Sequence, residues 1–350
     1  MLRADCKPGE TVHIAFPFAL PEAGLDCMTV AAVQRAVLPG TPAGYEAAFG
    51  QVWHNHVAAQ LTLPAPQLVE MDCNIGVKGK GFEYIFGRGK GLVSIRYNGV
   101  QLLDDTVRPN FWRAPTNNDE GCAEPFAFAF WKTSGLYARC DHLTAETRGE
   151  FVTVRAVYTL PDGQTLPIDF AIDCAGRCDI TMTWQGERAE VPEFGLLFPL
   201  RRELTEVSYQ GLGPRETTAD RTAGGKMGVW NYNVRQDFAQ NSPVYPQECG
   251  SRTGVYRAAL TGRDTEVPGI RFASDDGMTF SALPYTPHEL ENARHLYELP
   301  RDDNKTIVRC AAFQRGVGGD NSWGAKPHAD ACFAVEKGMT FSFSIQKQNG

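Results

Sequence analysis

The sequence has no long apolar run and no excess of basic residues. Nowhere does it reach the roughly 18 consecutive apolar residues of a membrane span. Its 34 Lys and Arg are outnumbered by 41 Asp and Glu, which gives a formal net charge of -7. This acidic balance argues against nucleic acid or an anionic membrane as the main partner. Residues 1–10 lack the apolar core of a signal peptide, so we expect a cytoplasmic protein.

Disulfide, zinc and nucleotide motifs are also missing. The ten cysteines are scattered without any Cys-x-x-Cys, and a chain of this length folds without covalent staples, so we predict mostly buried thiols in a reducing compartment. His288-Glu289 would need a second histidine where Asn292 stands to form a zinc-protease helix. Neither a Walker motif nor a Gly-x-Ser-x-Gly elbow occurs.

Helical periodicity is scarce, whereas strand signals are frequent. The 35 glycines and 22 prolines suit short strands joined by turns. Alternating or β-branched and aromatic runs predict strands at residues 12–16, 28–37, 47–57, 82–86, 92–97, 151–160, 168–173, 180–184 and 338–346. A short helix is predicted at Thr286-Pro287-His288-Glu289, where Thr is the N-cap and Glu the capping-box partner. Because strands do not alternate with helices, we predict an all-β fold without βαβ units.

The strands fall into two predicted domains. Residues 1–60 hold three or four candidate strands, which is too few for a sandwich of about seven. This segment therefore looks like part of a domain whose start is missing. Residues 61–68, with Pro64 and Pro66, indicate an extended linker. After it, strands continue almost to the end, and we predict a second domain over residues 61–350.

Three loops combine aromatic, cationic, amide and carboxylate side chains. They are residues 111–121 (FWRAPTNNDEG), residues 211–216 (GLGPRE) followed by Asp220-Arg221, and residues 316–324 (GVGGDNSWG). An indole stacks on the apolar face of a pyranose while amides and carboxylates bind its hydroxyls, so these loops favour sugar recognition. Turns with buried tryptophans are the alternative. We favour burial for Trp112 and exposure in a site for Trp323.

These motifs resemble the C-terminal β-domain of the β-galactosidases of glycoside hydrolase family 2, the large lactose-splitting enzymes of bacteria. Order and spacing agree at four places, which are Arg113 to Gly121, Gly211 to Glu216 with Asp220-Arg221, Pro246 to Arg252, and Gly318 to Trp323. The resemblance covers about residues 62–350 strongly. It implies a large antiparallel supersandwich similar to galactose mutarotase, preceded in residues 1–60 by a partial immunoglobulin-like β-sandwich.

The resemblance also implies that the chemistry lies elsewhere. Retaining glycosidases use two carboxylates about 5 Å apart, and in this family both sit on a (β/α)₈ barrel that precedes the region. Such a barrel takes about 250 residues, and this chain has no βα alternation to build one. We therefore assign no catalytic residue, cofactor or metal ligand here. Mg and Na ions are expected in the complete enzyme on the missing domains, and the chain alone is expected to be inactive.

Five residues receive a site role from the resemblance. Trp323 matches the tryptophan that borders the family's substrate pocket, which implies stacking on the sugar on the aglycone side. Asp320, Asn321 and Ser322 would hold its loop and reach sugar hydroxyls. Gly121 would act as a hinge for residues 122–125 at the pocket mouth. A structural role, as buried ion pairs between loops, is expected for Arg113, Asp119, Arg215, Glu216 and Arg221.

The sequence thus indicates the C-terminal fragment or small subunit of a retaining β-galactosidase that hydrolyses terminal β-D-galactosides such as lactose. Its partners would be the β-galactoside and the remainder of the enzyme, a barrel domain or a large subunit, in a homo-oligomer. Met1 allows a separate small subunit, whereas a start inside a domain favours a fragment. A stand-alone carbohydrate-binding module is one alternative. An aldose 1-epimerase, which would need a His base facing a carboxylate, is the other.

Overall fold

The computed structural model describes residues 10–13, 24–35, 37, 39–56, 65–263, 266–321 and 324–348. The chain divides into two units, Met1–Ala59 and Gln60–Gly350. Two assignments stay predictions. They are a partial immunoglobulin-like domain for residues 1–60 and the C-terminal supersandwich domain for residues 61–350.

The first unit contains one long hairpin. Strands β1 (Gly24–Val33) and β2 (Glu46–His56) pair antiparallel along their whole length. The two strands predicted at residues 28–37 and 47–57 are therefore present, although β1 begins and ends about four residues earlier than predicted. The strand predicted at residues 12–16 falls largely outside the described residues, and residues 11–13 are not in a strand. Much of the predicted linker at residues 61–68 also lies outside them.

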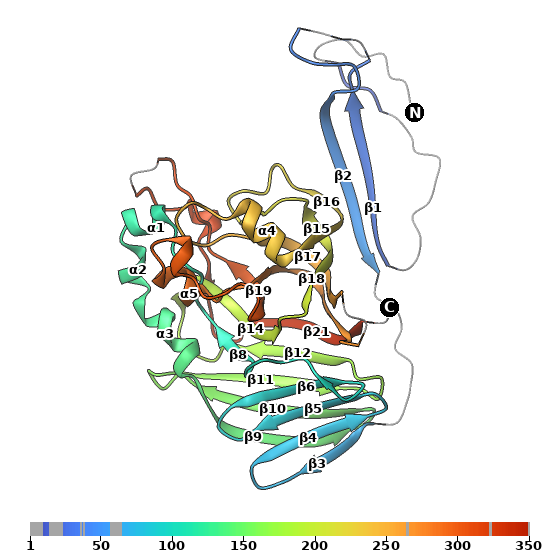
Figure 1. Ribbon diagram of the computed structural model, residues 1–350, viewed down its shortest axis with the longest axis vertical. Helices are drawn as coiled ribbons and strands as arrows, with labels where there is room; N and C mark the ends of the chain where they lie inside the picture. Colours follow the sequence, from blue (N-terminus) through green and yellow to red (C-terminus); the bar gives the residue numbers. More distant parts are fainter. Residues whose placement is uncertain are drawn as a thin grey trace. The chain divides into compact units, whose positions relative to one another are not determined.

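The second unit begins with a small meander of five antiparallel strands (Figure 1). Its strands are β3 (Gln67–Glu70), β4 (Asn74–Gly79), β5 (Phe82–Gly87), β6 (Gly91–Tyr97) and β7 (Val100–Gln101). Alternate residues of β5 are buried, as the two-residue period of a strand requires. The buried rings of this sheet pack on the neighbouring large sheet, where Phe86 meets Phe170 at 4.9 Å between ring centroids.

The large sheet has 12 strands among the described residues, and every pairing is antiparallel. One continuous path runs β16-β15-β17-β18-β21-β12-β11-β10-β9, and β19, β14 and β8 branch from β18. The strands are β8 (Arg108–Asn110), β9 (Arg139–Arg148), β10 (Phe151–Thr159), β11 (Thr165–Ile172), β12 (Cys178–Thr183), β14 (Glu193–Arg201), β15 (Leu204–Gly213), β16 (Lys226–Asn233), β17 (Ser251–Gly262), β18 (Gly269–Leu283), β19 (Lys305–Gln314) and β21 (Thr340–Gln348). A two-stranded ribbon joins β13 (Ala189–Glu190) to β20 (Ala334–Val335). The predicted all-β fold built on a large antiparallel sheet is confirmed.

Short helices lie along the outer side of this unit (Figure 1). They are α1 (Asn117–Gly121), α2 (Glu124–Ala127), α3 (Ala129–Tyr137), α4 (Val234–Asn241) and α5 (Pro287–Asn292), with 3₁₀ turns η1 (Leu296–Glu298) and η2 (Ala329–Ala331). The capping box predicted for Thr286 and Glu289 is present at the start of α5. An aromatic cluster packs α3 on the sheet. The ring centroid of Trp131 lies 5.4 Å from that of Phe111 and 5.9 Å from that of Trp184. Within the described part of the chain, no helix is both long and apolar enough to cross a membrane.

The cysteines correct one prediction. Nine lie among the described residues and all nine are free thiols, but only Cys140, Cys178, Cys249 and Cys310 are buried. The buried four lie in strands or beside them, where side chains face the core. Others, such as Cys73 and Cys174, lie in turns that cross the surface, so the prediction of mostly buried thiols is wrong in extent.

Candidate functional site

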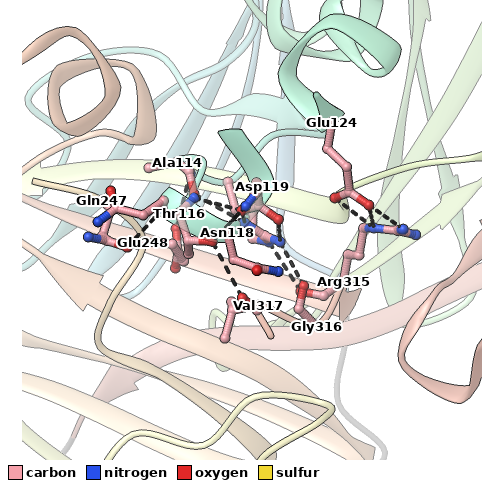
Figure 2. A network of polar contacts seen from close by, with 12 residues as sticks. Ala114, Thr116, Asn118, Asp119, Glu124, Gln247, Glu248, Arg315, Gly316 and Val317 are labelled. Atoms are coloured by element: carbon pink, nitrogen blue, oxygen red, sulfur yellow. Dashed lines mark hydrogen bonds and ion pairs between the residues drawn. The ribbon is translucent and has the colours of Figure 1, made fainter. Parts of the chain in front are cut away.

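The four sequence motifs meet at one place in the second unit. Glu216 of the second motif accepts a hydrogen bond from Gly250 N of the third at 2.7 Å. Glu248 of the third accepts one from Ala114 N of the first at 3.2 Å. The first motif in turn contacts the segment that leads into the fourth (Figure 2). Segments far apart in the sequence therefore form one polar frame.

The first motif folds into a capped turn that aims a carboxylate inward. Thr116 is the N-cap of α1, and its Oγ1 accepts the Asp119 N–H at 3.2 Å. Asp119 Oδ2 accepts the Thr116 N–H at 2.6 Å, which completes a capping box with aspartate in the usual position of glutamate. The side chain of Asp119 is thereby held in the interior, where only 3% of it is exposed.

Arg113 pairs with Asp119 and reaches the incoming loop. Its guanidinium donates to the two Asp119 carboxylate oxygens at 2.6 and 3.0 Å. It also donates to Arg315 O at 3.1 Å and Gly316 O at 2.7 Å. Burial opposes ionisation of Asp119, but the Arg113 charge and the Thr116 hydrogen bonds outweigh it and lower the pKa of that carboxyl. The predicted burial of these two residues in an ion pair is confirmed, but the pair lies within one motif and does not join two loops.

Two further buried ion clusters complete the frame. Arg315 forks onto Glu124 of α2 with two Nε contacts of 3.1 Å, and its guanidinium lies over the Phe128 ring at 5.1 Å. Arg309 of β19 binds both Glu193 and Glu248, at 2.6 Å in the first case. Burial is the main reason that the pKa of Glu193 is raised, although Arg309 opposes it. Each of these buried carboxylates is thus paired with an arginine, which indicates a structural role.

The predicted role of the second motif holds only in part. Glu216 and Arg221 form an ion pair at 2.8 Å, but half of the Arg221 side chain is exposed, and Arg215 lies on the surface. The contacts of this motif with the fourth come from Asp220 instead, which is itself exposed. Its Oδ2 accepts the Val317 and Gly318 N–H groups at 2.9 and 2.7 Å. Sequence reasoning assigned Asp220 only to the family pattern and did not predict this contact.

The site loop, residues 316–325, is held at both ends by this frame. Besides the Arg113 and Asp220 contacts at its start, Asn118 Nδ2 donates to Ala325 O at 2.8 Å at its end. Gly324 has a φ of +87°, and a Cβ there would stand 2.4 Å from Gly121 O. Only glycine fits at 324 without strain, since a side chain would meet main chain in a left-handed conformation. This contact also places Gly121 against the loop, whereas its predicted hinge role stays a prediction.

The tip of the site loop contains the predicted substrate-binding residues. Asp320 and Asn321 are both exposed. Asp320 Oδ1 lies 2.7 Å from His328 Nε2, and that hydrogen bond is the main reason that the pKa of His328 is raised. Ser322 and Trp323 lie outside the described residues. The pairing of His328 with Asp320 was not predicted, because no local sequence pattern reveals it. Trp112, by contrast, is buried as predicted.

A separate cavity of about 280 Å³ lies between β8, α3 and α5. Two of its lysines are paired within the chain: Lys132 with Glu291 at 2.8 Å, and Lys305 with Glu289 at 2.6 Å. His288 Nε2 lies 2.7 Å from Lys132 O, and burial lowers the pKa of this histidine. In the described ranges, no three His, Cys, Asp or Glu side chains are grouped to hold a metal ion.

Comparison with known proteins gives consistent matches. A family model described as "Beta galactosidase small chain" matches residues 78–345. The chain is 34% identical over 348 residues to a β-galactosidase of Lactobacillus delbrueckii subsp. bulgaricus, which covers 97% of this chain and 34% of that protein. It is 32% identical over 308 residues to a β-galactosidase small subunit of Latilactobacillus sakei, which covers 78% of this chain and 95% of that one.

The chain therefore spans about a third of the length of the longer relative and almost all of the small subunit. Among solved structures it is similar to galactose 1-epimerase from Lactobacillus acidophilus NCFM. That likeness covers 93% of this chain and 100% of the other, with 8% identity and a TM-score of 0.35. At this level it carries no conclusion about activity.

Proposed function

Because the chain belongs to the β-galactosidase small-chain family, we propose that it forms one wall of the substrate pocket of a retaining β-galactosidase. The complete enzyme would hydrolyse terminal β-D-galactosides such as lactose. The catalytic carboxylates would lie on the remainder of that enzyme, a barrel domain or a large subunit. In this proposal Trp323 stacks on the sugar, while Asp320, Asn321 and Ser322 hold the loop tip and reach hydroxyls.

The observation that carries the proposal is the contrast within the site loop. Its start and end are bound by the buried Arg113, the exposed Asp220 and the half-buried Asn118. Its tip carries Asp320 with 80% of the side chain exposed. A rigid base with an exposed polar tip is the arrangement that presents binding side chains to a ligand in fixed geometry. The same tip holds Trp323 in the sequence, next to Gly324.

The buried acids support a role outside the chemical step. A retaining mechanism needs one carboxyl as acid and one as nucleophile, about 5 Å apart and accessible to the sugar. Asp119, Glu124 and Glu193 are instead buried against arginines. We therefore expect the chain alone not to hydrolyse β-galactosides. The expected Mg and Na sites, the homo-oligomer and the cytoplasmic location likewise stay predictions.

The test is reconstitution with the remainder of the same enzyme. The chain and the part that precedes it, or its separate large subunit, are purified and mixed, and hydrolysis of o-nitrophenyl β-D-galactoside is followed. We expect turnover from the mixture and none from the chain. Trp323→Ala should raise KM roughly ten-fold, as the loss of about 1.4 kcal/mol of stacking predicts.

Two controls make this test specific. Tyr297→Ala removes an aromatic ring outside the site loop that is 80% exposed, and it should leave KM unchanged. Turnover by the chain alone, abolished by a substitution within it, would overturn the proposed division of labour. Calorimetry of the chain alone with galactose and lactose distinguishes a stand-alone binding module, for which heat of binding is expected without any partner.

A further inference from the structure

Exposed apolar side chains gather on one short stretch of the second unit. Among its described residues, nine large apolar side chains are exposed, and four of them lie between residues 126 and 137. These four, which we call the α2–α3 apolar face, are Phe126 at 86%, Phe130 at 36%, Leu136 at 42% and Tyr137 at 67% exposure. Single exposed apolar residues are normal, but a cluster of them marks an interaction surface.

The helices beneath this face are firmly anchored. Within α3, Trp131 packs in the aromatic cluster and Ser134 is fully buried. Glu124 at the start of α2 is bound by Arg315 in the interior. The exposure of these side chains is therefore not a result of helix fraying. The fold holds them outward, at a cost in apolar hydration that a partner surface would remove.

The charge next to the face is neutralised inside the chain. Lys132, which lies on α3 beside Leu136, pairs with Glu291 of α5 at 2.8 Å. Glu291 also accepts the Trp112 indole N–H at 2.9 Å. The centres of protein interfaces are depleted of unpaired charge and enriched in aromatic residues. The α2–α3 apolar face has both properties, so it suits a protein partner.

The site loop indicates which protein that partner is. The face begins five residues after Gly121, whose main chain contacts Gly324 of the site loop. A partner seated on α2–α3 therefore also borders the loop. About two thirds of the length of the longer β-galactosidase relative lies outside this chain. If the site loop is one wall of a pocket, the other walls must come from that missing part.

We infer that the α2–α3 apolar face is the surface through which this chain docks on the catalytic part of the β-galactosidase. The inference rests on the proposed function and extends it by naming the contact. Phe126 and Tyr137, the most exposed members, are the expected anchors, because large aromatic side chains contribute most of the binding energy in protein interfaces.

The experiment measures affinity and footprint together. The remainder of the enzyme, produced as a separate polypeptide, is titrated with the wild-type chain and with Phe126→Ser, Tyr137→Ser and their double variant. Val229→Ser on β16, at 60% exposure, is the matched control. Thermal unfolding checks that each variant is folded. Hydrogen exchange with and without the partner maps the protected amides.

We expect each face variant to weaken binding at least about ten-fold, the double variant more, and the control not at all. Activity should return to the wild-type kcat at saturating partner, and amides of residues 124–137 should gain protection. If the face variants and the control variant bind with equal affinity, the inference is overturned. An active complex in the same experiment would still support the proposed function. Self-association of the chain through this face, without a footprint from the partner, would also overturn it. If the wild-type chain gives neither a complex nor activity, the proposed function is rejected, and the inference is rejected with it.

Discussion

The base and the tip of the site loop are each held by an ion pair, but in opposite surroundings. At the base, Arg113 and Asp119 are each only 3% exposed. At the tip, His328 and Asp320 are 66% and 80% exposed, although their contact of 2.7 Å is as short as the buried one. Distance alone therefore does not distinguish a pair in the interior from a pair at an exposed loop tip, whereas burial does.

Burial changes what the loss of one partner costs. Removing one member of a buried pair leaves an uncompensated charge in the interior, which costs about 3 to 5 kcal/mol. An exposed pair is screened by water and contributes about 0 to 1 kcal/mol. The base should therefore tolerate no change of charge, while the tip should tolerate many. Three measurements test this contrast, besides the two experiments above.

The largest effect is expected from Asp119→Ala. The Arg113 guanidinium would lose its counter-ion and two hydrogen bonds in the interior, so the free energy of unfolding should fall by about 3 to 5 kcal/mol. Urea denaturation measures it. Asp105→Ala is the control, since Asp105 pairs with Arg108 at 2.7 Å but is 59% exposed, and it should cost at most about 1 kcal/mol. Equal losses in the two variants would contradict the contrast.

A smaller effect is expected from Gly324→Ala at the end of the site loop. The new Cβ would meet Gly121 O at 2.4 Å in a left-handed conformation, so we expect a loss of about 2 to 3 kcal/mol or a displaced loop. Gly338 has nearly the same φ, +88°, with nothing within 4 Å of its position for a Cβ. Gly338→Ala should thus lose only the conformational part, about 1 kcal/mol. Matching denaturation curves for the two variants would show that the close approach of Gly121 to Gly324 does not affect the free energy of unfolding.

The smallest effect is a titration at the tip. Because Asp320 stabilises the charged imidazole, the pKa of His328 should exceed 6.5. A raised pKa in the folded state means that the stabilisation is complete below pH 6.5 and is lost as the pH rises through the folded value. Histidine NMR titration should show that Asp320→Asn lowers the His328 pKa, whereas Asp330→Asn lowers it less. No change in Asp320→Asn would show that the pair does not form in solution.

Much of the fold could be predicted because strands have a local signature. The alternation in residues 82–86 and 92–97 identified β5 and β6 nearly to the residue. Thr286 and Glu289 identified the start of α5, since a capping box lies within four residues. The order of strands in the large sheet could not be predicted, because β18 pairs with β17, β19 and β21 by contacts between distant segments.

The candidate site was predictable as a set of motifs but not as a frame. A buried ion-pair role could be assigned to Arg113 and Asp119 from the motif, although their pairing with each other was not predicted. Arg309 lies in none of the motifs, yet it binds acids from two distant segments. Asp220 binds Val317, which lies 97 residues away in the sequence. His328, which binds Asp320, belongs to none of the motifs. Such contacts arise from the tertiary fold and leave no local signal.

One detail of the frame bears on how this protein can diversify. Arg113, Asp220 and Asn118 hold the site loop through its carbonyl and amide groups, at Gly316, Val317, Gly318 and Ala325. The frame therefore recognises the path of the loop and hardly its side chains. The anchorage at Val317 and Ala325 can therefore survive a change of side chain, since only main-chain groups are bound there. Under the proposed function, positions 320 and 321 are accordingly where we expect a library to alter sugar preference while the anchorage of the loop is kept.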